Sequence, residues 1–387
     1  MKTRVALYSH DAVGLGHVRR NLALAGALAG DGRHSALLIA GAREAGTLPM
    51  PPGVECLTLP AFAKSDDGSY TSRTLDLSLA ALVRLRAETI RAALDMFEPD
   101  ALIVDKHPLG FGGELEPAVE LLRERGRTRL VLGLRDVLDD PGVVRAEWVR
   151  DGVEDAIERF YDRVWVYGDP RVYDTVREYG MAPRVAARTS YTGYLARREP
   201  TDPADGVPAG RLALCLVGGG QDGPAVASAF ANAPLPPGMT GVVVAGPFMP
   251  QDARRRLHAL AGRRQRLQVL DFVQEPQRLL RRADRVVAMG GYNTVCELLA
   301  ADRPALVVPR ERPRTEQLLR ARRLAALGLV HTLAPGDLSP RAIGDWLAGD
   351  ADRGPHPAGL VDLDGLRRVP RLMGELLSTG RVGSLVA

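Results

Sequence analysis

Polar and glycine residues follow many of the short apolar runs in this 387-residue chain, and their types suit proton transfer and phosphate binding. The first apolar run, residues 4–9, leads into a loop that ends at His17, whose imidazole could take a proton from a substrate hydroxyl. The positive end of the helix that starts near His17, together with Arg19 and Arg20, disfavours the imidazolium and should keep the ring neutral near pH 7. We therefore expect His17 to be a general base.

Several side chains in the same half of the chain compete with His17 for this role. His10 and His107 are alternative bases, and His17 itself could be only a helix-start residue or a polar ligand contact. Asp105 ends an apolar run and opens the polar loop DKHPLGFGGELEP, which suits a catalytic or acceptor-binding carboxylate. The next apolar run is followed by Arg135 and Asp136, which could bind the acceptor or could equally form an ion pair. The predicted catalytic residues are His17 and Asp105, and the predicted acceptor-side residues are Gly16, His107, Glu114, Arg135 and Asp136.

A glycine-rich turn in the second half could bind phosphate. Residues 218–223 satisfy G-x-G-x-x-G before a helix, where glycines let the backbone approach an anion at the helix N-terminus. A nicotinamide or flavin enzyme is disfavoured because the next apolar run ends at Ala245 and Gly246 instead of in an acidic residue. Asp222 would cap the helix at Pro224 but repel a phosphate. A tight turn with a capped helix is therefore the structural alternative.

A second turn opens the segment MGGYNTVCELLAADR. On the helix that follows, Glu297 lies one turn beyond Asn293 and Thr294 and is expected to face the strand ends. Thr294 and Glu297 also fit a T-x-x-E capping box, in which both side chains only satisfy helix amides. The sequence therefore leaves a ligand-binding and a capping role for Glu297.

Short apolar runs alternate with helical patterns from end to end, which is typical of parallel sheets covered by helices on both faces. Ligands of such sheets bind beyond the carboxyl ends of the strands, where the residues above lie. The Pro-, Gly- and Asp-rich stretch RREPTDPADGVPAG predicts a linker, after which the pattern restarts. We predict an α/β protein with two Rossmann-like domains facing each other across a cleft. The predicted units are residues 1–197, a linker at 198–210, residues 211–359, and a helical segment at 360–387 that packs back on the first domain.

Composition narrows the class of protein. Apolar residues make up 45% and charged residues 25% of the chain, as in an ordinary globular protein. The net charge is only +4, with acids interspersed among the arginines, so nucleic-acid binding is disfavoured. Three cysteines lie far apart in apolar stretches and are expected in the core. A start without a signal-peptide pattern and without a long apolar run predicts a cytoplasmic protein.

Two segments resemble the family 28 nucleotide-sugar glycosyltransferases of the GT-B architecture, of the MurG-like type. They are the opening YSHDAVGLGHVRRNLALA and the more specific MGGYNTVCELLAADRPALVVPRERPRTEQLLRARRLAALGL. The likeness is strongest to a bacterial group of predicted glycosyltransferases. It implies that the second domain binds a nucleotide-diphosphate sugar, with UDP favoured, and that the first presents an acceptor hydroxyl. It also implies transfer with inversion that needs no metal and no other cofactor.

The resemblance assigns roles to matching positions. Residues 219–221 would surround the diphosphate, Glu297 would hold the ribose hydroxyls, and Glu316 with Gln317 would read the sugar hydroxyls. Two departures are a glycine at 220 for the family's usual serine and a glutamate at 316 for a glutamine. The implied donor-binding residues are Gly219, Gly220, Gln221, Phe272, Val273, Gly290, Gly291, Asn293, Thr294, Glu297, Glu316, Gln317 and Arg197.

Alternatives and partners remain open at this stage. A UDP-N-acetylglucosamine 2-epimerase shares the architecture, and a non-catalytic nucleotide-sugar binding protein would share the donor residues. The acceptor could be a small molecule, a peptide, a glycan or a lipid-linked molecule. Residues 75–97 have a helical pattern with Arg84, Arg86 and Arg91, which could lie on an anionic membrane or be a solvated edge of the core. The D-x-D pairs at 350–352 and 362–364 are expected on the solvated surface and not at a metal site.

Overall fold

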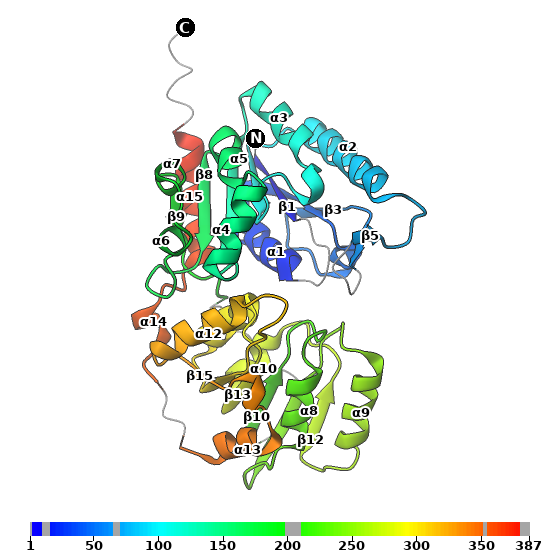
Figure 1. The fold of residues 1–387 in the computed structure, drawn as a ribbon, viewed down its shortest axis with the longest axis vertical. Coiled ribbons are helices and arrows are strands. Elements are labelled where there is room, and N and C mark those ends of the chain that lie inside the picture. The colour runs from blue at the N-terminus through cyan, green and yellow to red at the C-terminus, as the bar shows by residue number, and fades with distance from the viewer. Residues whose placement is uncertain (1, 10–15, 65–69, 198–209, 351–353, 380–387) are drawn as a thin grey trace.

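The computed structural model describes residues 2–9, 16–64, 70–197, 210–350 and 354–379, which form two α/β lobes, one above the other in Figure 1. Each lobe contains one parallel sheet with helices on both faces, as predicted from the alternation of apolar runs. The linker predicted at 198–210 lies outside the described residues except for Gly210.

In the described part of the N-terminal lobe, seven parallel strands follow the order β3-β2-β1-β6-β7-β8-β9. The strands are β1 (Thr3–Ser9), β2 (His34–Ala40), β3 (Val54–Thr58), β6 (Ala101–Asp105), β7 (Arg129–Arg135), β8 (Arg163–Tyr167) and β9 (Thr189–Tyr191). The covering helices are α1 (Gly16–Ala29), α2 (Leu79–Phe97), α3 (Glu116–Arg125), α4 (Pro141–Arg150), α5 (Val153–Phe160), α6 (Thr175–Tyr179) and α7 (Pro183–Ala186). Short elements η1 (Arg43–Thr47), β4 (Phe62–Lys64), β5 (Tyr70–Ser72) and η2 (Phe111–Gly113) fill the connections. The strand order reverses between β1 and β6, which places a crevice at their carboxyl ends.

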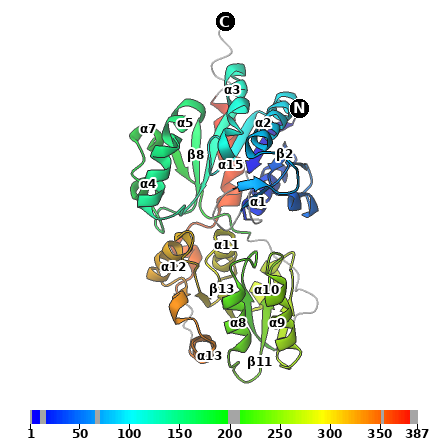
Figure 2. The ribbon, with the colours of Figure 1, turned by 45° about the vertical axis from the view of Figure 1, so that its right-hand side comes forward.

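The C-terminal lobe repeats this plan in the order β12-β11-β10-β13-β14-β15. Its strands are β10 (Arg211–Leu216), β11 (Met239–Val244), β12 (Leu267–Leu270), β13 (Arg285–Ala288), β14 (Ala305–Val307) and β15 (His331–Thr332). Its helices are α8 (Pro224–Asn232), α9 (Gln251–Ala261), α10 (Pro276–Arg282), α11 (Tyr292–Ala301), α12 (Glu316–Ala326) and α13 (Pro340–Ala348), with η3 (Pro335–Asp337) before the last. The equivalent crevice lies between β10 and β13. In Figure 2, α11 and α12 lie at the top of this lobe, facing the N-terminal lobe.

The chain ends on the lobe where it began. After α14 (Pro357–Leu360), Leu195 and Asp364 form a β-bridge, and α15 (Gly365–Ser378) packs against α1. Gly365 allows this crossing because a Cβ there would lie 2.6 Å from the Gly193 carbonyl oxygen. The expectation that Asp362 is solvated surface is wrong, because its carboxylate accepts from the Asp364 amide at 2.9 Å and pairs with Arg368.

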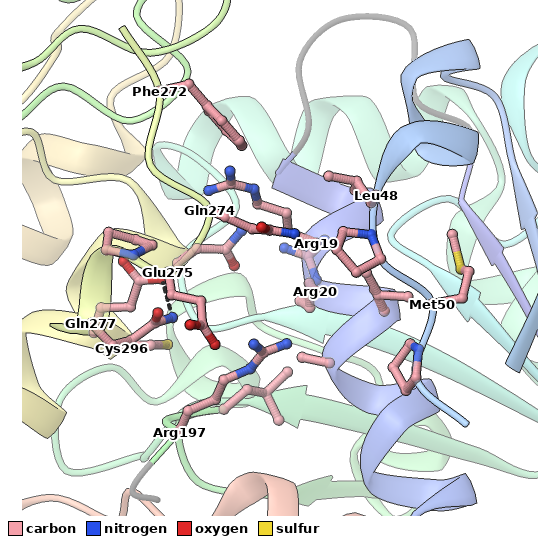
Figure 3. A pocket seen from close by; sticks show the side chains of 18 residues that line it. Arg19, Arg20, Leu48, Met50, Arg197, Phe272, Gln274, Glu275, Gln277 and Cys296 are labelled. Atoms are coloured by element: carbon pink, nitrogen blue, oxygen red, sulfur yellow. Dashed lines mark hydrogen bonds between the residues drawn. The ribbon is translucent and has the colours of Figure 1, made fainter. Parts of the chain in front are cut away.

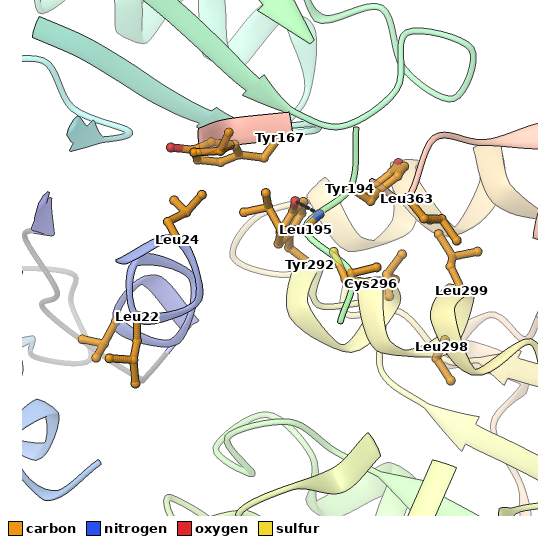
Figure 4. Packing of buried hydrophobic residues seen from close by; sticks show 14 of the residues in the cluster. Leu22, Leu24, Tyr167, Tyr194, Leu195, Tyr292, Cys296, Leu298, Leu299 and Leu363 are labelled. Atoms are coloured by element: carbon orange, nitrogen blue, oxygen red, sulfur yellow. Dashed lines mark hydrogen bonds between the residues drawn. The ribbon is translucent and has the colours of Figure 1, made fainter. Parts of the chain in front are cut away.

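The two lobes share one apolar cluster at the waist. Tyr194, Leu195, Tyr292, Cys296 and Leu363 meet there, drawn from both lobes and from the C-terminal crossing (Figure 4). The Tyr194 and Tyr292 rings stack with centroids 6.1 Å apart, and the Leu195 amide donates to the Tyr292 hydroxyl at 3.3 Å. Buried apolar packing therefore fixes how the two crevices face each other.

Candidate active site

A histidine, an aspartate and an arginine meet at the N-terminal crevice. His17 lies in the first turn of α1, and Asp105 ends β6, the neighbour of β1. His17 Nδ1 is 2.6 Å from Asp105 Oδ2, and Arg20 Nη2 donates to both carboxylate oxygens at 2.7 and 2.6 Å. Burial opposes ionisation of Asp105, but Arg20 and His17 outweigh it and hold the pKa of the carboxyl well below its usual range. Arg20 Nη2 also lies 2.8 Å from His17 Nδ1, so the three side chains form one charged cluster.

His17 is neutral at physiological pH. Burial, and secondarily Arg20 and Lys106, lower the pKa of its imidazole to about 4, although Asp105 opposes the shift. The side chain retains 20% exposure. This low pKa agrees with the neutral imidazole expected from the sequence. Its main cause is burial, whereas the sequence analysis expected the helix N-terminus and Arg19 to be the cause.

A cavity of about 360 Å³ between the lobes brings these groups together with the second lobe. It lies where the carboxyl ends of both sheets face one another, which is where open α/β sheets bind ligands. Its wall includes these predicted residues: Gly16, His17, Arg135, Gly219, Phe272, Val273, Gly291, Asn293, Thr294, Glu297, Glu316 and Gln317. Among the contacts that cross it is the hydrogen bond from Asn293 Nδ2 to the Gly16 carbonyl oxygen at 2.9 Å.

Glu297 is a partly buried carboxylate and not a helix cap. Gly291 is the N-cap of α11, no side chain caps that end, and Thr294 lies inside the helix, so the capping box does not form. Glu297 Oε1 instead accepts from Gln277 Nε2 at 2.9 Å. Burial raises the pKa of its carboxyl to about 7, against the opposing pull of Arg19 and Arg197.

A second cavity of about 510 Å³, drawn in Figure 3, shares Glu297 with the wall of the first. Arg197, predicted near the hinge, lines this second cavity and not the first. Across it, Arg19 of α1 lies over the Phe272 ring, with its guanidinium carbon 5.6 Å from the ring centroid. Residues from both lobes therefore flank the position of Glu297.

Of the three residues predicted to surround the diphosphate in the glycine turn after β10, one lines the first cavity. Gly219 lines the first cavity, whereas Gln221 is exposed outside its wall. Gly220 is buried at φ +92°, and a Cβ there would lie 2.3 Å from the Ala245 carbonyl oxygen. Gly220 does not line the cavity, and its amide donates to the Val217 carbonyl oxygen at 3.1 Å, so the structure does not bring this predicted diphosphate residue to the cavity wall. The expected Asp222 cap is also wrong, because the Asp222 carboxylate accepts from Arg310 Nη1 at 2.6 Å and α8 has no side-chain cap.

The sugar-reading pair predicted at the start of α12 is organised by an arginine that the sequence analysis missed. Arg310 Nη2 donates to Glu316 Oε1 at 2.7 Å, and its amide donates to Gln317 Oε1 at 3.1 Å. The Glu316 side chain is 3% exposed, and Oε2 has no hydrogen-bond partner among the described residues. Glu316 therefore lines the cavity with Oε1 engaged by Arg310 and Oε2 buried.

Asp136 is a structural residue between the lobes, which corrects its predicted acceptor role. It is fully buried and pairs with Arg320 of α12, with Nη2 2.7 Å from Oδ1, and accepts from the Tyr194 hydroxyl at 2.9 Å. Arg320 Nη1 also donates to the Gly290 carbonyl oxygen at 3.0 Å. Gly290 therefore lies beneath the turn, outside the cavity wall, and is held there by the ion pair.

Glu114 and His107 also lie away from the cavity. Glu114 is fully buried and accepts from Arg86 Nη2 at 2.7 Å and from the Tyr8 hydroxyl, so it is a core ion pair and not an acceptor residue. This pair also corrects the expectation of a solvated Arg86. His107 lines a small separate cavity, and burial lowers the pKa of its imidazole to about 3. His10 lies outside the described residues.

Two findings concern metals and membranes. Over the described ranges, His, Cys, Asp and Glu side chains gather nowhere in a group of three or more that could hold a metal ion. None of the helices in those ranges combines the length and apolarity that crossing a bilayer requires.

Two Rossmann-like lobes that bind across their facing crevices define the GT-B class. Solved structures agree with this class over nearly the whole chain. They include MurG of Acinetobacter baumannii (TM-score 0.55, 16% identity, 97% of this chain and 99% of that one) and CalG4, the calicheamicin glycosyltransferase (0.58, 18%, all of both chains). A protein of Listeria monocytogenes described as a UDP-N-acetylglucosamine 2-epimerase is similar too (0.61, 14%, 99% and 98%).

A family model matches part of the second lobe. Residues 244–347 match the model of the glycosyltransferase family 28 C-terminal domain. An uncharacterized glycosyltransferase of Methanosarcina acetivorans is 24% identical over 243 residues. That alignment covers 62% of this chain and 61% of the relative.

Proposed function

We propose that this protein is a glycosyltransferase that moves a sugar from a nucleotide-diphosphate sugar, with UDP favoured, to an acceptor hydroxyl with inversion and without a metal. One observation carries the proposal: a single cavity has His17, backed by the buried Asp105, on one wall and the glycine turns with Glu297 on the other. The match of the second lobe to the family 28 C-terminal domain supports the donor side.

The second lobe is assigned the donor. The diphosphate would lie against Gly219 and the N-terminus of α11 at Gly291, where backbone N–H groups can stabilise the departing phosphate. Glu297 would accept from the ribose hydroxyls, and the backbone at Phe272 and Val273 would meet the base. Glu316 and Gln317 would then face the sugar.

The first lobe is assigned the proton transfer. As the acceptor oxygen bonds to the anomeric carbon and the bond from that carbon to the phosphate oxygen breaks, His17 Nε2 takes the hydroxyl proton. Attack from the face opposite the diphosphate inverts the anomeric centre. Asp105 stabilises the imidazolium that forms, and Arg20 fixes the carboxylate at 2.6–2.7 Å. The Asn293 bond to the Gly16 backbone joins the helix N-terminus on the donor side to the start of α1.

A panel of UDP, dTDP, GDP and ADP, scored by the shift in melting temperature, tests the donor assignment. A nucleotide at a hundredfold excess over its Kd stabilises the folded state by about 2.7 kcal/mol, so the correct base should give the largest shift. We expect UDP to do so. A panel in which no nucleotide shifts the melting temperature would contradict the proposal.

An epimerase is the second candidate, because one of the similar solved structures carries that description. Incubation with UDP-N-acetylglucosamine alone separates the two activities. A transferase should give only slow hydrolysis, whereas an epimerase should release the 2-epimer or free N-acetylmannosamine. Tight UDP binding with no turnover in any acceptor screen would instead identify a non-catalytic binding protein.

We place the protein in the cytoplasm, with peripheral contact of the first lobe with the membrane. Leu77, Leu79 and Leu85 are exposed at the start of α2, beside the exposed Arg84, and this combination suits an anionic lipid surface. Cosedimentation with phosphatidylglycerol vesicles tests the contact. We expect binding that Leu79→Ser with Leu85→Ser weakens, and equal sedimentation of both proteins would contradict it.

A further inference from the structure

Arg19 reaches from the first lobe to the donor side of the cleft, and the function proposed above leaves it unused. It lies in the first turn of α1, two residues after His17, and its half-buried side chain lines both cavities between the lobes. Its guanidinium carbon is 5.6 Å from the centroid of the Phe272 ring, which belongs to the second lobe and is 45% exposed (Figure 3). Arg19 therefore contacts the opposite lobe at the place proposed for the donor base.

The start of α11 fixes what Arg19 faces on the donor side. α1 and α11 begin side by side, joined by the hydrogen bond from Asn293 Nδ2 to the Gly16 carbonyl oxygen at 2.9 Å. One turn along, α1 bears Arg19 and α11 bears Glu297. Burial raises the pKa of the Glu297 carboxyl and Arg19 opposes this shift, whereas burial lowers the pKa of the Arg19 guanidinium and Glu297 opposes that one. Arg19 thus lies near the carboxylate assigned to the ribose and one turn from the helix end assigned to the diphosphate.

Arg19 lacks the counter-charge that the other described arginines of the first cavity have. Each of those has a carboxylate oxygen within 4.0 Å: Arg20 with Asp105, Arg135 with Glu316, Arg310 with Glu316 and Asp222, and Arg314 with Asp139 and Glu147. Arg135 has the longest of these separations, 3.9 Å, and it lies beside Glu316, at the end of the cavity assigned to the sugar. Within the described ranges, Arg19 forms no ion pair and contacts only the Phe272 ring. An anionic ligand would supply the missing counter-charge.

We propose that Arg19 binds the donor from the opposite lobe, through the phosphate next to the ribose. The inference rests on the proposed transferase function, because it takes the ribose at Glu297 and the diphosphate at Gly291 from that assignment. A guanidinium can make two parallel hydrogen bonds to a phosphate, and its charge would offset that of the departing diphosphate. Because Arg19 and His17 share the first turn of α1, the same contact would also fix the position of the base relative to the donor.

A ligand series with and without phosphate tests the contact. The ligands are uridine, UMP and UDP, or the same series of the base that the melting-temperature panel selects, with affinities measured by calorimetry. We expect Arg19→Gln to bind UMP and UDP about tenfold or more weakly than wild type, because a charge-assisted contact is lost, and to bind uridine equally well. Arg19→Lys keeps the charge without the two-point contact and should lose only about threefold for UMP and UDP.

Arg323 of α12 provides the matched control for a contact that only joins the lobes. Its guanidinium carbon is 5.8 Å from the centroid of the Tyr173 ring of the first lobe, but Arg323 lines neither of the two cavities. Arg323→Gln should bind all three ligands as wild type does. Urea unfolding of both glutamine variants should give similar midpoints, so that a loss of affinity in Arg19→Gln is not a loss of folding.

Three outcomes would overturn the role of Arg19. The first is equal affinity of wild type and Arg19→Gln for UMP. The second is an equal loss for uridine and UMP, which would assign the guanidinium to the nucleoside. The third is a lysine variant as weak as the glutamine variant, because the charge would then contribute nothing. Failure of the donor assignment itself is seen separately, as a wild-type protein that binds neither nucleotide.

Discussion

The two lobes have the same strand order around their crevices but fill them with different chemistry. The N-terminal crevice contains charged side chains in ion pairs, led by Asp105 with Arg20 and His17. The C-terminal crevice combines backbone at Gly219 and Gly291 with the carboxylate of Glu297 and the Arg310–Glu316 ion pair. Backbone binding depends on glycine at particular positions and so leaves a recognisable sequence. The family model matches residues 244–347, which contain Gly291 but not Gly219.

The largest effect on stability is expected at the buried ion pair that joins the two lobes. Asp136→Asn leaves Arg320 buried without its counter-charge and should cost about 3–5 kcal/mol of unfolding free energy, measured in urea. Arg323→Gln is the matched control, since its pair with Glu178 also crosses between the lobes but is exposed. It should cost about 1 kcal/mol or less. Equal losses in the two variants would show that the buried pair is not what joins the lobes.

The next effect isolates the side-chain chemistry of the first lobe. His17→Ala should lower turnover about a hundredfold or more and leave UDP affinity unchanged, because the base touches only the acceptor. The exposed His258→Ala, on the other lobe, should keep wild-type turnover. Since the pKa of His17 is about 4, wild-type kcat should show no histidine titration between about pH 6 and pH 8. Normal turnover in His17→Ala would move the base assignment to Asp105.

Alanine substitutions at two glycines of the second lobe should have different effects, one on stability and the other on UDP affinity. Gly220→Ala forces a side chain into the φ +92° conformation and toward the Ala245 carbonyl, and should cost about 1–3 kcal/mol of stability. At Gly219, the nearest atom to a new Cβ is Phe248 Cδ2 at 3.4 Å, an ordinary contact. Gly219→Ala should therefore fold normally and bind UDP several times more weakly in calorimetry. The reverse pattern would contradict the assignment of Gly219 to the diphosphate.

The smallest effect concerns the carboxylate of the second lobe. Folding raises the pKa of the Glu297 carboxyl from 4.5 to about 7, so ionisation of this carboxyl opposes folding. The free energy of unfolding therefore falls as the pH rises from 4.5 to 7. Glu297→Gln should therefore melt higher than wild type near pH 8 and similarly near pH 4. It should also bind UDP about fivefold more weakly, because a neutral amide replaces a charged acceptor. Unchanged affinity would remove the ribose role.

The sequence predicted the alternation of strands and helices well, because parallel sheets need apolar runs that are buried on both faces. The sequence also predicted that His17 and Asp105 lie at the same edge of the sheet, because residues that follow neighbouring parallel strands meet there. It failed for Glu114 and Asp136, whose partners lie 28 and 184 residues away. A carboxylate after a strand looks the same in sequence whether it faces a ligand or a buried arginine.

Gly220 failed for a different reason. The motif marks it as flexible backbone but does not show which way the turn opens, and that direction is set by packing against β11.

The packing of α15 against α1 affects how this protein folds during synthesis and which fragments of it can be stable. Val369, Met373 and Leu376 are buried on the lobe that the first 197 residues form, so that lobe lacks part of its apolar cover until α15 has been synthesised. During synthesis the helix bearing His17 stays uncovered while the whole second lobe emerges. A fragment cut at the waist would expose this surface and aggregate more readily, whereas a circularly permuted chain that starts at α15 would retain its cover.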